Sequence, residues 1–121
     1  MNPVVNIQTA LEAVTEHWSP KVVGRVNDQY VKVVKVLGEF VWHKHDDEDE
    51  MFHVVKGQLR IDYEAGPVVL NAGDFHIVPK GVMHRPVALA ECELVLIEPV
   101  ATKHTGDVVS DLTRSIDAQL A

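Results

Sequence analysis

Apolar residues change their spacing twice along the chain. They recur at helical intervals from Ile7 to Trp18, and Ser19-Pro20 then interrupts that pattern. From residue 21 to residue 99 they instead form short runs rich in β-branched residues, which favour β-strands. The pattern therefore predicts a helical segment over residues 1–20, a β domain over residues 21–100 and an arm over residues 101–121.

The β domain contains about eight or nine short runs separated by turn residues such as Gly66-Pro67 and Asn71-Ala72-Gly73-Asp74. Many short strands at this spacing are typical of an antiparallel sandwich or barrel, and this number suits a jelly roll. The predicted fold class is all-β, a jelly-roll barrel with a short N-terminal helix. The expected strands are residues 22–26, 30–36, 51–55, 59–63, 68–70, 75–78, 83–89 and 92–98.

The β pattern stops after Pro99. Residues 102–110 predict an irregular arm, whereas Leu112, Ile116 and Leu120 recur at helical spacing. Both a short helix and a frayed tail are consistent with these last residues.

Composition and charge limit the kind of partner. A chain of 121 residues has room for one domain. Its formal net charge of -7 argues against binding nucleic acid or an anionic membrane surface, because both require clustered Lys and Arg. With no signal peptide and no transmembrane run in the sequence, we expect a cytoplasmic protein that binds a small molecule.

The single cysteine, Cys92, has no partner for an internal disulfide, which suits a reducing compartment. It lies in an apolar run, so we expect a small core residue rather than a catalytic thiol.

The stretch between Trp42 and Glu50 carries candidate chemistry. His43 and His45 are two residues apart, so in a strand both side chains project from one face. Imidazole is the commonest protein ligand for divalent transition metals, but a His-x-His pair alone also occurs often by chance. Glu50 begins the next β run, and His84 follows a turn into a later strand that can face the pair across a barrel.

Three imidazoles and one carboxylate accept one divalent transition metal: iron, manganese, nickel, cobalt or zinc. Four protein ligands leave positions of an octahedron open for water or substrate, as a catalytic metal requires.

The spacing of these residues resembles the two motifs of the cupin superfamily. The first motif is matched, with one gap a residue short, by Gly38, His43, His45, Glu50 and Gly57. The second motif is matched without a gap by Gly73, Pro79, Gly81 and His84. The Asn that ends the second motif in the family is replaced by Ala88, which is not a ligand position. The resemblance covers residues 21–99 and implies a metal bound by His43, His45, Glu50 and His84.

The acidic run over residues 46–49 leaves an alternative for the carboxylate ligand. Asp49 also satisfies the shorter motif spacing, but only Glu50 keeps the six-residue gap to Gly57. We expect the other acids to form a solvated loop, with an attraction of cations to the barrel mouth as a second interpretation.

The remaining histidines and aromatic residues have weaker signals. Alternation turns His53 outward, whereas His76 either lines the pocket or packs. His17 and His104 lie outside the barrel and are expected to be solvated. Core positions are expected for Phe40, Phe52 and Phe75.

Three functions are compatible with such a site. The first is a small metal-dependent enzyme of isomerase or dioxygenase type. The second is a module that binds or senses a small ligand without turnover, and the third is a metal that only holds the barrel together. Short cupins resemble proteins described as mannose-6-phosphate isomerase-like, but no basic cluster for a phosphosugar accompanies the motifs here.

The strand that begins at residue 30 has apolar residues on both faces, with Val31, Val33 and Leu37 on one and Val34 and Val36 on the other. Both faces are therefore expected to be buried. Because the N-terminal helix covers only part of the outer face, we expect a homodimer. The alternative is a monomer in which this helix and the C-terminal arm together cover the face.

Overall fold

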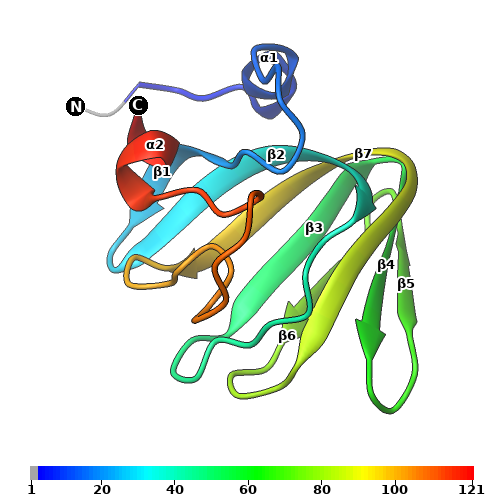
Figure 1. The fold of residues 1–121 in the computed structure, drawn as a ribbon. Coiled ribbons are helices and arrows are strands. Elements are labelled where there is room, and N and C mark those ends of the chain that lie inside the picture. The colour runs from blue at the N-terminus through cyan, green and yellow to red at the C-terminus, as the bar shows by residue number, and fades with distance from the viewer. Residues whose placement is uncertain (1–2) are drawn as a thin grey trace.

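Within residues 3–121, which the computed structural model describes, seven strands and two short helices follow one another along the chain (Figure 1). No helix in this part is long and apolar enough to cross a membrane. The elements are α1 (Ile7–Glu12), β1 (Lys21–Val26), β2 (Gln29–Glu39), β3 (Glu50–Lys56), β4 (Gln58–Tyr63), β5 (Val68–Asn71), β6 (Phe75–Val78), β7 (His84–Pro99) and α2 (Ile116–Leu120).

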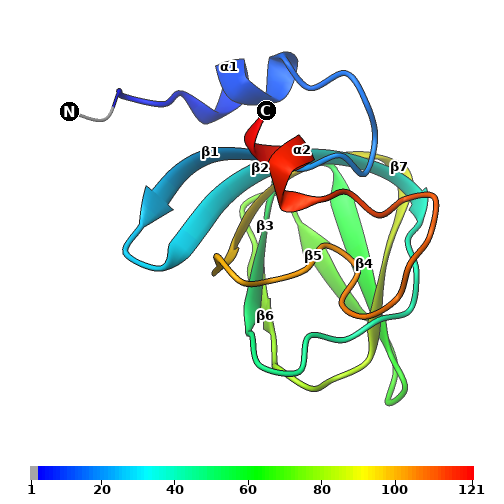
Figure 2. The same cartoon turned by 60° about the vertical axis from the view of Figure 1, so that its left-hand side comes forward.

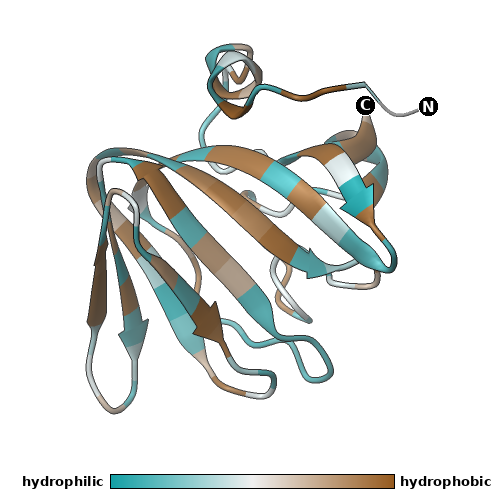
Figure 3. Ribbon diagram, turned by 180° about the vertical axis from the view of Figure 1, so that it is seen from behind, coloured by the Kyte–Doolittle hydropathy of each residue, from teal (hydrophilic) through white to brown (hydrophobic). Residues whose placement is uncertain are grey.

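All strand pairs are antiparallel, and the sheet order is β1-β2-β7-β3-β6. Strand β4 also pairs with β7, and β5 pairs with β4. The sheet curls into a barrel around one core (Figures 1 and 2). Hydrophobic and hydrophilic residues alternate along much of the strands, as expected where one face meets a core (Figure 3). The predicted all-β jelly-roll barrel is confirmed.

Strand β7 ties the two sides of the barrel together. Its first residues pair with β4, and its last residues pair with β2 and β3. The prediction of two separate strands over residues 83–89 and 92–98 was wrong. Residues 84–99 instead form one continuous strand. Its pairing with β2 is irregular between Val36 and Gly38, and opposite this irregularity Leu89 and Glu91 are exposed to solvent.

Helix α1 is shorter than the periodicity predicted. Asn6 caps its start by accepting a hydrogen bond from the Thr9 amide, and the helix ends at Glu12 instead of Trp18. The backbone of His17 and Trp18 pairs with Lys35 in β2, so it is not available for helical hydrogen bonds. Tertiary pairing has overridden the local helical pattern.

One side chain of strand β6 does not lie where the sequence predicted. Phe75 was expected in the core, yet it is 63% exposed. Val78 faces the core and the side chains of a strand alternate, so Phe75 and Ile77 must face outward.

Helix α2 closes one end of the barrel through a polar residue. Leu120 is half exposed, whereas Gln119 is buried and its side-chain oxygen accepts a hydrogen bond of 2.5 Å from Lys32 Nζ. Lys32 Nζ also lies 3.2 Å from the Glu98 carboxylate. Of the two possibilities that the sequence left open, the short helix is the one present, and its buried contact is made by an amide that satisfies an enclosed lysine.

Replacing Gln119 with Ala should lower the free energy of unfolding by about 2 kcal/mol, because a hydrogen bond to a buried charged group is lost. Gln58→Ala, at an exposed position, is the matched control and should cost less than about 0.5 kcal/mol. Urea denaturation of metal-free protein measures both. In a Lys32→Met background the cost of Gln119→Ala should shrink, and an unchanged cost would show that the two side chains are not coupled.

Candidate metal centre

The loop after β2 and the start of β7 place three histidines at the same end of the barrel. His43 and His84 face each other in an antiparallel bridge, with N–O distances of 3.0 and 2.9 Å in the two directions. The carbonyl of His45 accepts a hydrogen bond of 2.7 Å from Gly81 in the turn before β7. Glu50 is the first residue of β3 and is buried. Backbone hydrogen bonds therefore fix the relative positions of the side chains.

The tautomers of two imidazoles are fixed by the chain itself. His43 Nδ1 lies 2.8 Å from the carbonyl of Val41, and His84 Nδ1 lies 2.9 Å from that of Val82. A carbonyl only accepts, so each Nδ1 must carry the proton. Each Nε2 is then left with a lone pair, the form that binds a metal ion.

The structure brings together all four residues singled out in the sequence. One possible ligand atom from each of His43, His45, Glu50 and His84 lies within 4.8 Å of the others. Glu50 Oε1 is 3.4 Å from His45 Nε2 and 3.7 Å from His84 Nε2. These three atoms are buried and have no hydrogen-bond partner within the described residues. Buried polar atoms without partners are costly, so the arrangement fits a cation between them.

Electrostatics favour the protonation states that a metal requires. Burial alone would raise the pKa of Glu50, but contacts with His45 and His84 outweigh it and hold that pKa well below its usual range. Burial, followed by the nearby His84, lowers the pKa of His43 to about 4. At neutral pH the carboxylate is thus ionised and the His43 imidazole is neutral.

Asp49, the alternative carboxylate, has a different contact. Its Oδ1 accepts a hydrogen bond of 2.9 Å from the amide of Lys80, outside the cluster. Asp46 pairs with Lys44 at 3.3 Å, and both side chains are about half exposed. Most of the acidic run therefore has the solvated loop character expected from its sequence.

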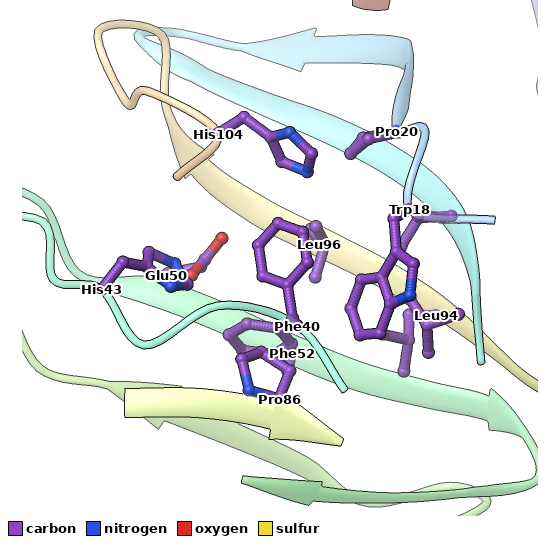
Figure 4. Close-up of a pocket in the computed structure, with 12 residues that line it drawn as sticks. Trp18, Pro20, Phe40, His43, Glu50, Phe52, Pro86, Leu94, Leu96 and His104 are labelled. Carbon is purple, nitrogen blue, oxygen red and sulfur yellow. The ribbon is translucent and has the colours of Figure 1, made fainter. Parts of the chain in front are cut away.

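A cavity opens beside two of the four residues. His43 and Glu50 line one part of it, and the remaining wall is mostly apolar (Figure 4). The cavity is small, with a volume of about 30 Å³, about the space of a water molecule. The lining residues are Trp18, Pro20, Val34, Val36, Phe40, His43, Glu50, Phe52, Pro86, Leu94, Leu96 and His104.

The sequence reasoning missed a second carboxyl group next to Glu50. Glu98 in β7 is buried and faces Glu50 from the neighbouring strand. Burial and the charge of Glu50 raise the pKa of Glu98 well above its usual range, against the opposing effect of Lys32. Alternation held the signal, because Glu98 shares a strand face with the core residues Leu94 and Leu96.

His104 was expected to be solvated, and this was wrong. Its ring is largely enclosed, lies 5.0 Å from the Phe40 ring between centroids and lines the cavity. Gly106 explains how the arm reaches this position: its left-handed backbone lies against the Lys44 carbonyl, where a Cβ would clash. No periodic pattern in residues 101–106 could have revealed this docking.

The other histidines lie away from the ligand cluster. His17 is exposed and pairs with Glu91 at 2.7 Å. His53 faces away from the core, as alternation predicted. His76 packs against Tyr63, whose hydroxyl lies 2.7 Å from His76 Nε2. Burial, with Glu50 adding to it, raises the pKa of Tyr63 to about 12, so its hydroxyl keeps its proton at neutral pH.

Cys92 is a core residue, as predicted. It is fully buried, and burial followed by the charge of Glu93 raises its pKa to about 11, which makes it a poor nucleophile.

The sequence and structure of this chain are similar to those of known proteins. The sequence model of the cupin domain matches residues 31–98. The uncharacterized protein YdbB of Bacillus subtilis is 36% identical over 86 residues, which are 70% of this chain and 76% of YdbB. A cupin-2 domain containing protein from Shewanella frigidimarina is 45% identical, with a TM-score of 0.78 over 79% of this chain and 94% of that one. Protein NMB1881 from Neisseria meningitidis is 34% identical, with a TM-score of 0.74 over 80% and 99% of the respective chains.

Proposed function

Because this chain belongs to the cupin family, whose domain it matches over residues 31–98, we propose that it binds one divalent transition metal ion and holds a small molecule beside it. The proposed ligands are His43, His45, Glu50 and His84. When bound, such an ion supplies Lewis-acid or redox chemistry to an oxygen-bearing molecule.

One observation carries this proposal: three buried polar atoms converge without hydrogen-bond partners within the described residues. Folding an unpaired polar atom into an apolar core costs about 1–3 kcal/mol, and three in one place need a common compensating group. Imidazole nitrogens with one carboxylate oxygen suit iron, manganese, nickel, cobalt or zinc, and donor types alone do not choose among them.

An enzyme of isomerase or dioxygenase type is the function we favour. A small cavity reaches His43 and Glu50, whereas a metal that only held the barrel together would need no cavity beside its ligands. None of the residues that line this cavity is Lys or Arg, so a phosphosugar has no counter-charge there.

A module that binds a small molecule without turnover is the alternative. Apart from the four proposed ligands, His104 is the only titratable group in the cavity wall of the described structure. Steady-state turnover with a panel of diketones, phenols and thiols distinguishes the two functions. A cytoplasmic location, and the absence of nucleic-acid and membrane partners, remain predictions.

Replacing His43, His45 and His84 together with Ala should abolish binding of divalent metal, because only Glu50 of the four ligands would remain. Elemental analysis of protein purified without an affinity tag measures the bound metal. A His17→Ala/His53→Ala variant, which alters two histidines outside the cluster, should keep the metal of the unaltered protein. Stoichiometric metal in the triple variant would refute the site.

Glu50→Gln should weaken metal binding at least about tenfold, because a neutral amide replaces the charged ligand atom. Asp49→Asn should change it by less than about twofold, since the Asn carbonyl can still accept the hydrogen bond from Lys80. Competition with a chelating dye measures both affinities. Equal losses, or the reverse order, would move the carboxylate ligand to Asp49.

The outer sheet face supports the homodimer expected from the sequence. Strand register places Val31, Ile97, Met51 and Ile77 in one row across β2, β7, β3 and β6. Helix α1 covers the neighbouring part of this outer face, where Leu11 packs against Val33 of β2 and Val95 of β7. A second copy related by a two-fold axis would cover the remaining row, which is half-buried or exposed in one chain.

Light scattering at micromolar concentration should therefore give twice the chain mass of 13.5 kDa. Ile77→Lys should shift the mass toward one chain, because it introduces a charge into the proposed contact. Val69→Lys, at an exposed position on β5, is the control and should leave the mass unchanged. A mass near one chain for the unaltered protein would exclude the dimer.

A further inference from the structure

The four proposed metal ligands are enclosed in the barrel. None of the side chains of His43, His45, Glu50 and His84 belongs to a residue more than 5% exposed. The cavity beside two of them has the space of about one water molecule. A larger molecule can therefore reach a bound ion only where part of the surrounding wall opens.

The barrel wall contains a gap in its backbone pairing. Neighbouring strands share backbone hydrogen bonds along the order β5-β4-β7-β3-β6, and β5 lies on the outer side of β4 (Figure 1). Within residues 3–121, no backbone pairing joins the two ends of this order, β5 and β6. A cleft of about 410 Å³, lined by residues 68–70 and 73–76, lies between these two strands. We call this gap between β5 and β6 the seam.

One side-chain hydrogen bond spans the seam. It joins the hydroxyl of Tyr63, at the end of β4, to His76 Nε2 in β6 over a distance of 2.7 Å. Apart from the bonds of the connecting turn over residues 71–74, no other hydrogen bond in the described part of the chain joins β4 or β5 to β6. Segments with few such bonds open locally at a lower free energy than the paired strands of a sheet.

Both partners of this hydrogen bond lie next to the metal ligands. Tyr63 is directly opposite His84 in the register of β4 and β7, and the centroids of the two rings are 6.5 Å apart. His76 is directly opposite Phe52 in β3, two residues after the ligand Glu50. An opening between Tyr63 and His76 would therefore lead to the ligand cluster.

An open cleft lies on the other side of Tyr63. Its volume is about 630 Å³, and its walls include the turn over residues 64–67 and the loop over residues 81–83, which leads directly into His84. A molecule too large for the internal cavity has room in this cleft.

The seam thus lies between open clefts and enclosed ligands. We propose that the seam is the entrance through which small molecules reach the metal centre, and that the hydrogen bond between Tyr63 and His76 holds it closed. Opening moves β5 and the turn over residues 64–67 away from β6, because β5 pairs only with β4. The entrance leads to the bound ion, so this inference rests on the proposed function.

The test uses Co²⁺-loaded protein, because the visible absorption of this ion changes when it gains a ligand. Acetohydroxamate, a chelator larger than water, is mixed with the protein in a stopped-flow instrument. Tyr63→Phe removes only the hydroxyl and should raise the rates of binding and of release by the same factor, about five- to tenfold. The dissociation constant should stay unchanged, because the lost hydrogen bond closes the seam in the free and in the bound protein alike.

Two substitutions of His76 test the hydrogen bond itself. His76→Leu should raise both rates as Tyr63→Phe does. His76→Gln should keep them within about twofold of the unaltered protein, because an amide can accept from the hydroxyl or donate to it. Tyr30→Phe is the matched control: it removes the hydroxyl of the chain's other tyrosine, on β2, and should change neither rate.

Hydrogen exchange measures the opening without any metal. Backbone amides over residues 64–71 should exchange faster in Tyr63→Phe and His76→Leu than in the unaltered protein, as followed by mass spectrometry. Exchange in Tyr30→Phe should be unchanged in this segment.

Entry under the C-terminal arm is the competing route. Gly106→Ala should lift the arm from Lys44, because a Cβ has no room there. Faster binding in Gly106→Ala together with unchanged rates in Tyr63→Phe would overturn the proposal. A changed dissociation constant with an unchanged binding rate in Tyr63→Phe would also overturn it, because the hydroxyl would then act on the bound molecule and not on the entrance.

The failure of this inference can be told apart from the failure of the metal site. Protein that loads Co²⁺ but shows unaltered rates in Tyr63→Phe and His76→Leu refutes the entrance alone. Protein that takes up no Co²⁺ refutes the proposed metal site, and hydrogen exchange then decides whether this hydrogen bond holds the seam closed.

Discussion

A carboxylate enclosed in an apolar barrel is the constraint on which the rest of this structure depends. Glu50 and Glu98 face each other in the interior, and Lys32 is the only lysine in contact with either among the described residues. Two ionised carboxylates at this depth would leave one charge unbalanced, at a cost of several kcal/mol. The chain resolves this asymmetrically: burial and the charge of Glu50 favour a protonated Glu98, while the imidazoles keep Glu50 ionised. One charged oxygen therefore remains for a cation.

This constraint also explains the position of the C-terminal segment. Lys32 cannot reach solvent, so it needs acceptors inside the protein, and Gln119 of α2 supplies one. The arm that leads to α2 passes close to the loop between His43 and His45, because Gly106 allows its backbone to lie against Lys44. The polar interior of the barrel thus recruits the segment that brings His104 into the cavity wall.

Sequence patterns predicted the features that depend on neighbouring residues better than those that depend on contacts between distant segments. Alternation along strands is local, so it predicted the barrel and the outward direction of His53. His43 and His45 do point into one site, but from the loop after β2 and not from the strand in which they were expected. The same alternation would have exposed Phe75 and buried Lys32 and Glu98, had each strand been read from its neighbouring core residues instead of from residue type. The convergence of His84 with the first pair came from motif spacing, which records long-range geometry that periodicity cannot.

Other features depend on contacts between distant segments and leave no local pattern. Helix α1 ends early because the backbone of His17 pairs with that of Lys35 in β2, which lies eighteen residues further along the sequence. His104 is buried because a glycine two residues later fits against the loop after β2, and neither residue type predicts that contact.

Metal binding and folding are linked in a barrel of this kind. An unfolded chain does not hold four ligands together, so an ion that binds the folded site stabilises the fold by mass action, by about 2.7 kcal/mol at a hundred times its dissociation constant. That gain is similar to the cost of enclosing a few unpaired polar atoms. A small chain with a limited apolar core can therefore tolerate His45, Glu50 and His84 in its interior if the ion is present. The same unpaired atoms that make the site costly when it is empty favour a cation, because a cation accepts the nitrogen and oxygen lone pairs and also balances the charge of Glu50, which an apolar occupant cannot do.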